Sequence, residues 1–154
     1  MHSPTCSRVN APLYNTRILR LAATIPYQHR LEAPMASVEK RSPICGSRVT
    51  VDVMVDDAGR IAELGLLVRA CALGQASASL MAANAIGKSV AELETARDTL
   101  AAWLAGGEAA PDWPDLDIFA PALPHSARHA SIRLAFEAVA EAAAQAAATH
   151  AVAH

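Results

Sequence analysis

The stretch RVTVDVMVDDAGRIAELGLLVR at residues 48–69 decides the fold of this chain. Apolar side chains recur at every second position in both of its halves: Val49, Val51, Val53 and Val55, then Ala62, Leu64, Leu66 and Val68. This alternation is typical of half-buried β-strands, and the intervening DDAGR offers a glycine for a tight turn. We therefore predict an antiparallel hairpin of strands 48–56 and 61–69. Its valines should face the core, and Asp52 should lie on a solvated face.

Helical patterns surround this hairpin. Apolar residues at helical spacing predict helices over 13–25, 72–86, about 89–105 and 127 to the end, and Ser89 with Glu92 forms a capping-box pattern. We expect residues 1–11 to be a flexible tail, 26–44 an extended arm or loop, and 106–125 a loop or insertion. Residues 12–154 then form a single domain. The order of elements predicts an α+β fold, a small antiparallel β-sheet with helices packed on one face.

Composition excludes several classes of protein. Hydrophobic residues make up 53% of the chain and charged residues 18%, which excludes a disordered tail protein. A net charge of −2 and an aromatic share of 4% predict no binding to nucleic acid. The lack of a long uncharged apolar run predicts no membrane span. Three cysteines without a signal peptide favour a reducing compartment, the bacterial cytoplasm, with the mitochondrial matrix as the alternative.

Two cysteines flank the predicted hairpin. Cys45 precedes the first strand, and Cys71 lies where the second strand meets a helix. Because the positive end of a helix dipole favours thiolate, we expect a lowered pKa for Cys71. Cys45 lies 12 residues before Asp57 and Cys71 lies 11 residues after Arg60, so both should lie at the open end of the hairpin. The two thiols are either a metal-binding or sulfur-handling pair, or small buried apolar residues.

Several motifs together resemble a known family. Cys45-Gly46 opens a strand, Ala70-Cys71-Ala72 opens a helix that continues as QASAS over residues 75–79, and Gly87-Lys88-Ser89 follows. Residues 13–142 thereby resemble the U-type iron–sulfur cluster assembly scaffolds (IscU, SufU and the N-terminal domain of NifU). The stretch 106–131 is similar to the insertion of the SufU branch. The resemblance implies thiolates that hold iron or a [2Fe–2S] cluster. It also implies a cysteine desulfurase and iron–sulfur acceptor proteins as partners.

The chain departs from this family at two ligand positions. Ser47 stands where the family usually has aspartate, and Ser131 aligns with its third cysteine. The resemblance thus leaves Cys45 and Cys71 as metal and cluster ligands, with Cys71 also a possible sulfur acceptor. His129 is either a third ligand or an exposed residue at a helix start, and His125 is a more distant candidate.

Three functions follow from the resemblance and its departures. The first is a scaffold-like protein that binds iron or an iron–sulfur cluster and is not an enzyme. The second is a zinc-dependent SufU-like sulfurtransferase that accepts persulfide from a cysteine desulfurase. The third is a degenerate, non-catalytic paralogue that keeps the fold and binds a partner. Iron with visible absorbance, stoichiometric zinc and no metal would distinguish the three.

Overall fold

The structure is a computed structural model that describes residues 15–43 and 46–153, so the predicted tail at 1–11 and Cys45 lie outside the described residues. The elements follow in the order α2 (Thr16–Ala23), β1 (Ala36–Arg41), β2 (Arg48–Val55), β3 (Ile61–Arg69), α3 (Ala72–Ala85), α4 (Val90–Leu104), the 3-10 helices η1 (Leu116–Ala122) and η2 (Ser126–Arg128), and α5 (His129–Ala153). The predicted helices are all present. The capping box of α4 is confirmed, since Ser89 Oγ accepts from the Glu92 N–H and the Glu92 side chain accepts from the Ser89 N–H.

The predicted hairpin is the centre of a three-stranded antiparallel sheet in the order β1-β2-β3. The four valines of β2 that alternate are buried, as the pattern predicts, and Val68 of β3 is partly buried. The register shifts between Met54 and Val55, so that Val55 pairs with Ile61 and Ala62 is the extra residue. Ala62 is therefore exposed rather than inward-facing, and Ile61 takes its place in the core.

Strand β1 corrects the prediction of an arm or loop over 26–44. It pairs with β2 along its whole length, from Ala36 opposite Val53 to Arg41 opposite Arg48. Only Ala36 and Val38 are buried in this strand. Two apolar residues in a short edge strand are too weak a pattern to predict pairing from the sequence.

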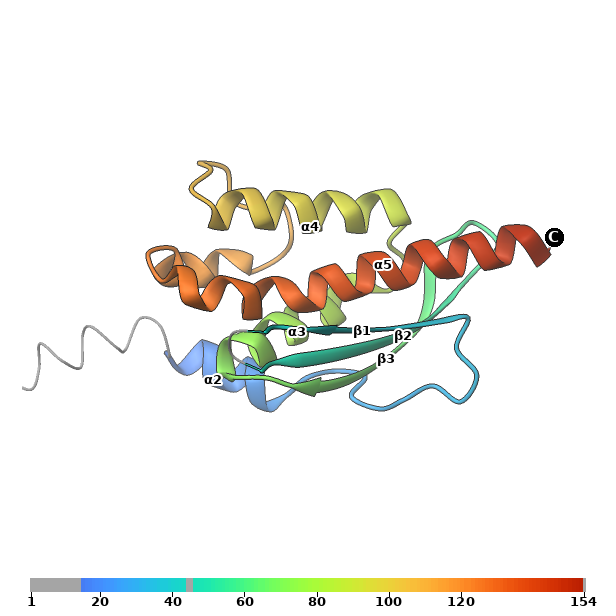
Figure 1. Ribbon diagram of the computed structural model, residues 1–154, viewed down its shortest axis with the longest axis horizontal. Coiled ribbons are helices and arrows are strands. Elements are labelled where there is room, and N and C mark those ends of the chain that lie inside the picture. Colours follow the sequence, from blue (N-terminus) through green and yellow to red (C-terminus); the bar gives the residue numbers. More distant parts are fainter. Residues whose placement is uncertain (1–14, 44–45, 154) are drawn as a thin grey trace, which may run out of the picture.

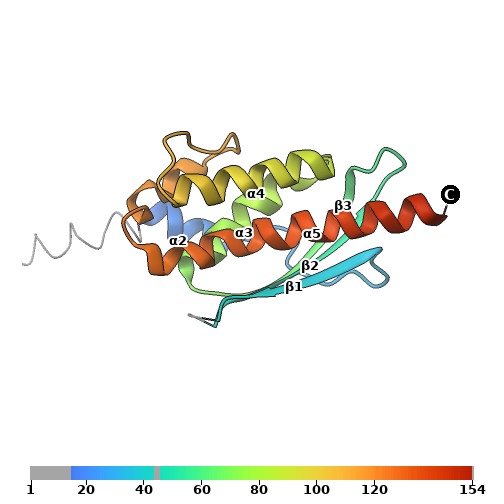
Figure 2. The same ribbon diagram turned by 45° about the horizontal axis from the view of Figure 1, so that its top comes forward.

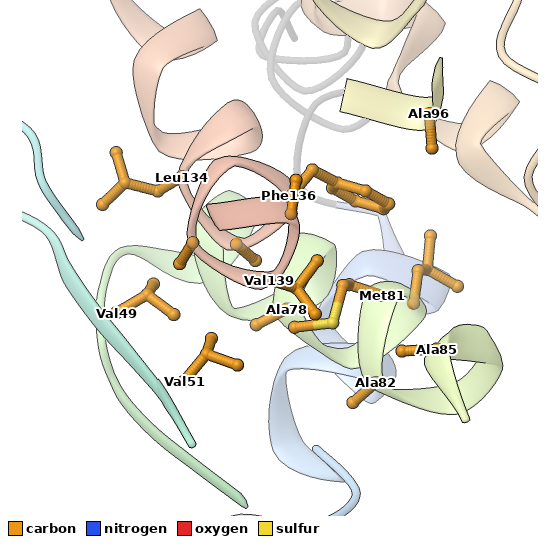
Figure 3. Packing of buried hydrophobic residues seen from close by; sticks show 14 of the residues in the cluster. Val49, Val51, Ala78, Met81, Ala82, Ala85, Ala96, Leu134, Phe136 and Val139 are labelled. Atoms are coloured by element: carbon orange, nitrogen blue, oxygen red, sulfur yellow. The ribbon is translucent and has the colours of Figure 1, made fainter. Parts of the chain in front are cut away.

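Helices α3, α4 and α5 lie on one face of the sheet, which confirms the α+β fold, and α2 packs against α3 (Figure 1). Helix α5 runs along β1 and β2, and α3 and α4 pack against α5 on the same side (Figure 2). Figure 3 shows Val139 of α5 next to Ala78 of α3 and the Phe136 ring on the side of α5 that faces Ala96, all of them buried. In the part of the chain that the structure describes, no helix has the length and apolar character needed to span a membrane.

The segment 106–125 is anchored to this core. The Trp113 indole N–H donates to the Leu80 carbonyl oxygen at 2.9 Å. Its ring meets Phe136 edge-on, with the ring centroids 5.2 Å apart. Helix η1 follows and contributes buried residues, including Leu116 and Phe119. The segment is thus held in place over the core before the chain enters α5.

A strap formed by residues 24–35 crosses the other face of the sheet, from the edge of β3 to the start of β1. The Leu66 N–H donates to the Tyr27 carbonyl oxygen at 2.9 Å, and the Met35 N–H donates to the Val53 carbonyl oxygen at 3.0 Å. Between these bonds the strap lies directly on Gly65. A Cβ built on Gly65 would lie 2.5 Å from the His29 carbonyl oxygen, so a glycine is required there.

Asp52 lies beneath this strap, which corrects the prediction that it is solvated. Its carboxylate is 0% exposed. It accepts from Arg30 Nε at 2.7 Å and Nη2 at 3.1 Å, from Ser37 Oγ at 2.6 Å, and from the Leu31 N–H at 3.0 Å. Burial alone would raise the pKa of Asp52, but these hydrogen bonds and the Arg30 charge outweigh it and hold the pKa below its usual value.

Candidate functional site

Cys71 lies between β3 and α3, where the sequence predicts it. It is the N-cap residue of α3, with extended backbone angles, and its carbonyl oxygen accepts from the Gln75 N–H at 2.8 Å. Its thiol is half-buried, is in no disulfide, and makes no capping hydrogen bond. Cys71 therefore presents a free thiol at the N-terminal end of a helix, where backbone N–H groups favour negative charge.

Ser47 lies at the same end of the sheet. Because Arg48 pairs with Arg69, Ser47 at the start of β2 comes beside the junction that carries Cys71. The loop before it is closed by backbone bonds: the Ser42 N–H donates to the Ser47 carbonyl oxygen at 2.8 Å, and the Gly46 N–H donates to the Ser42 carbonyl oxygen at 3.0 Å. Cys45 belongs to this loop but lies outside the described residues, so its proximity to Cys71 stays a prediction.

Ser131 reaches the same place from the first turn of α5. It is 2% exposed, and its Oγ lies 3.3 Å from Ser47 Oγ, a hydrogen bond between residues 84 positions apart. The two serines at positions where the resemblance implies ligands are thus in direct contact. In Figure 1 the start of β2, the end of β3 and the start of α5 lie at the same end of the sheet, opposite the turn between β2 and β3.

Two residues that the sequence did not identify make this convergence possible. Gly74 lies one turn after Cys71, and a Cβ built on it would lie 2.8 Å from Ala70 Cβ and 3.3 Å from the Ser131 carbonyl oxygen. One turn further along α3, Ser77 Oγ donates to the Ile132 carbonyl oxygen at 2.5 Å. A glycine inside an alanine-rich helix is the signal that indicates such a close contact.

His129 is the first residue of α5 and is partly buried. Its Nε2 lies 3.0 Å from both the Ala122 and the Leu123 carbonyl oxygens. Since carbonyl oxygens only accept, we assign the proton to Nε2, which leaves Nδ1 as the only ring nitrogen able to bind a metal. His129 therefore fastens α5 to the end of η1. His125, the more distant candidate, is exposed.

The donor set does not fit a resident tetrahedral metal ion. In the described residues, which exclude Cys45, no three histidine, cysteine or acidic side chains come together. Even with Cys45 added, the four positions that the resemblance implies as ligands would hold two thiols and two neutral hydroxyls. Structural zinc takes four ligands from cysteine, histidine or carboxylate, and a hydroxyl is a poor substitute beside thiolate.

Comparisons with known proteins agree with this geometry. The model of the family described as NifU-like N terminal domain matches residues 14–151. The chain is 39% identical to the N-terminal part of a nitrogen-fixing NifU-like protein from Brucella abortus, over 90% of this chain and 96% of that one, with a TM-score of 0.85. No curated protein sequence matches the chain.

A second solved structure shares the fold alone. It is a putative iron–sulfur cluster assembly scaffold protein for the SUF system from Fervidobacterium islandicum AW-1. The two chains are 19% identical over 86% of this chain and 98% of that one, with a TM-score of 0.76.

Proposed function

Because the chain belongs to the NifU-like N-terminal domain family, we propose that it is a scaffold-like protein of iron–sulfur cluster assembly whose Cys45 and Cys71 thiols receive the cargo. The observation that carries this proposal is the Ser47–Ser131 contact beside the Cys71 junction. It supports the proposal because Ser47 and Ser131, at two positions where the resemblance implies ligands, meet beside the junction that carries Cys71. The cargo, iron or a [2Fe–2S] cluster, is the substrate and not a resident cofactor.

A site with only two thiol ligands should bind iron or a cluster weakly. Iron–sulfur clusters are normally held by four protein ligands, mostly thiolates, and a chain that supplies two leaves the remaining positions to water, to small thiols or to a partner. Thiolate is the form that binds iron, and Cys71 lies at the N-terminal end of α3. We therefore expect cargo that is acquired readily and released readily, as suits a protein that passes it on.

The partners and the compartment belong to the same proposal. A cysteine desulfurase would supply sulfur, and iron–sulfur acceptor proteins would take the product. The bacterial cytoplasm, where glutathione and thioredoxin keep thiols reduced, suits free cysteines.

Anaerobic reconstitution with ferrous iron and sulfide tests the proposal. The parent protein should retain iron and sulfide after desalting, and Cys45→Ala and Cys71→Ala should each lose most of both. Cys6→Ala is the matched control, because it removes a thiol outside the predicted site and should retain the cargo. Equal retention in all four proteins, or equal loss in the control, would contradict the proposal.

A second candidate function is partner binding without cargo. The 3.3 Å contact between two buried hydroxyls favours it, because the contact closes the space that the family's ligands would use. The same reconstitution then gives no retained iron in the parent.

The zinc-dependent sulfurtransferase is the third candidate, with Cys71 as the acceptor. Its thiolate would attack the terminal sulfur of a persulfide on the desulfurase, the sulfur–sulfur bond would break, and the desulfurase thiolate would leave. This candidate requires stoichiometric zinc in the purified protein.

A further inference from the structure

Three arginines form one row across the whole sheet. Arg41 of β1 pairs with Arg48 of β2, and Arg48 pairs with Arg69 of β3. Directly paired residues of antiparallel strands point to the same face. The neighbours Lys40 and Val49 point to the helical face, where Lys40 Nζ lies 2.7 Å from Glu141 of α5. The arginine row therefore points to the opposite, outer face, and it spans about 10 Å at the usual strand spacing.

The row carries more positive charge than its surroundings neutralise. Glu39 is the acidic side chain beside it, with Oε2 at 2.6 Å from Arg41 Nε and 3.9 Å from Arg48 Nη1. Within the described residues Arg69 forms no ion pair. Like charges at directly paired positions destabilise a sheet, so the row does not serve the fold. It stands out further because the chain as a whole is acidic, with a net charge of −2.

A hollow of about 380 Å³ adjoins the row. Its lining comes from all three strands and from the strap: Arg30, Ser37, Glu39, Arg48, Thr50, Leu67 and Arg69. The guanidinium of Arg30 is half-exposed although it is paired with Asp52, and Leu67 is 37% exposed. The surface thus combines guanidinium groups with a small apolar contact.

This basic surface borders the candidate site. Arg48 follows Ser47 directly, and Arg69 precedes Cys71 by two residues. A second hollow, lined by Arg41, Ser42, Pro43, Gly46 and Arg48, continues the surface around the loop before β2. A molecule resting on the row would therefore reach the edge of the sheet where Cys71 lies.

We propose that the arginine row is the docking surface for an acidic surface of a partner protein that exchanges cargo at Cys71. Only the partner's role in cargo exchange rests on the proposed function. Guanidinium groups bind carboxylates through paired hydrogen bonds, so a row of three suits several carboxylates on one protein surface. A nucleic-acid backbone carries a negative charge at each phosphate, so Glu39 would repel it wherever it rested on the row. A protein surface can instead place a positively charged side chain opposite Glu39. The lining also offers no aromatic side chain for stacking bases.

Binding of an acidic peptide by the metal-free protein tests this proposal. The probe is a fluorescein-labelled (Glu-Glu-Leu)5 peptide, followed by anisotropy at low and at physiological salt. A labelled oligothymidylate with the same number of negative charges is the comparison probe. The paired variant Arg48→Gln/Arg69→Gln should weaken peptide binding at least ten-fold. The control Arg20→Gln/Arg97→Gln makes the same change in net charge on α2 and α4 and should change binding less than two-fold.

The peptide-binding experiment can overturn the proposed role of the arginine row in three ways. Equal weakening in both paired variants, no peptide binding by the parent, or tighter binding of the oligothymidylate would overturn the proposal. If the row variant does not fold, NMR of the parent supplies the test, because the peptide should shift amide signals at residues 39–41, 48–50 and 67–69. Since no metal is needed, a failure here is distinct from a failure to retain iron in the reconstitution experiment.

Discussion

Two buried polar clusters lie along β2 and the residue before it, and they are built in different ways. Asp52 in the middle of the strand accepts four hydrogen bonds at 2.6 to 3.1 Å, two of them from Arg30. Ser47, just before the strand, meets Ser131 at 3.3 Å with no charge on either side. The first cluster fixes the strap to the sheet through strong charge-assisted bonds. The second brings a loop and a helix together through a contact between two neutral hydroxyls.

Removing the Asp52 carboxylate should cause the largest loss of stability. Asp52→Ala leaves the partly buried Leu31 N–H and the Ser37 hydroxyl without their acceptor, removes the partner of Arg30 and frees the strap. We expect a loss of about 3 kcal/mol in the free energy of unfolding, measured by urea denaturation. Asp57→Ala is the control, because the Asp57 carboxylate is exposed in the turn between β2 and β3, and it should cost less than about 0.5 kcal/mol. Equal losses would mean that the strap does not depend on Asp52.

Gly65, the residue paired with Asp52, gives the next largest effect. Gly65→Ala would place a Cβ 2.5 Å from the His29 carbonyl oxygen, so the strap would have to move away from the sheet. Overpacking of this kind costs about 1–3 kcal/mol. Urea denaturation should show that loss for Gly65→Ala, whereas Ala62→Ser at an exposed position of the same strand should be nearly neutral. A neutral Gly65→Ala would show that the strap is free to shift.

Acid should weaken the first cluster through the pKa of Asp52. That pKa is held below its ordinary value in the folded protein, so ionised Asp52 contributes stability above its unfolded pKa of about 3.9. The contribution is lost as pH falls from that value through the folded pKa. The stability difference between the parent and Asp52→Asn should therefore be largest near pH 7 and shrink below about pH 4. A difference that stays constant down to pH 2 would contradict this assignment.

The sequence predicts features that follow from a local pattern and misses those that depend on distant partners. The hairpin and its buried valines follow from local alternation, and α4 follows from its capping box. The burial of Asp52 depends on Arg30, which is 22 positions away in a strap without periodicity. Strand β1 and the shift at Met54 likewise depend on partners rather than on their own residues. The meeting of Ser47 with Ser131 was approachable only through family resemblance, because 84 positions separate the two residues.

Substitutions in the second cluster, Ser47 with Ser131, should change stability least and metal retention most. Ser131→Cys replaces one small buried side chain with another of similar size, so we expect a change of less than about 1.5 kcal/mol in unfolding free energy. If the protein is a scaffold that binds iron weakly because ligands are missing, the new thiolate joins Cys45 and Cys71. The amount of iron bound per chain after anaerobic reconstitution should then rise. Ser47→Asp should add a carboxylate to the same set and raise retention further.

A matched control separates ligand geometry from the mere presence of another thiol. Ser79→Cys adds a buried thiol to α3, where Ser79 Oγ makes only a 3.4 Å contact with the Thr24 carbonyl oxygen. Iron retention should stay at the parent level in Ser79→Cys, because its thiol lies more than two helical turns from the N-cap at Cys71.

The opposite outcome for the ligand positions is that Ser47→Asp/Ser131→Cys folds and retains no more iron than the parent. The packing around the Ser47 and Ser131 hydroxyls would then leave no room for a metal site. That result would favour partner binding over cargo handling as the function of this chain.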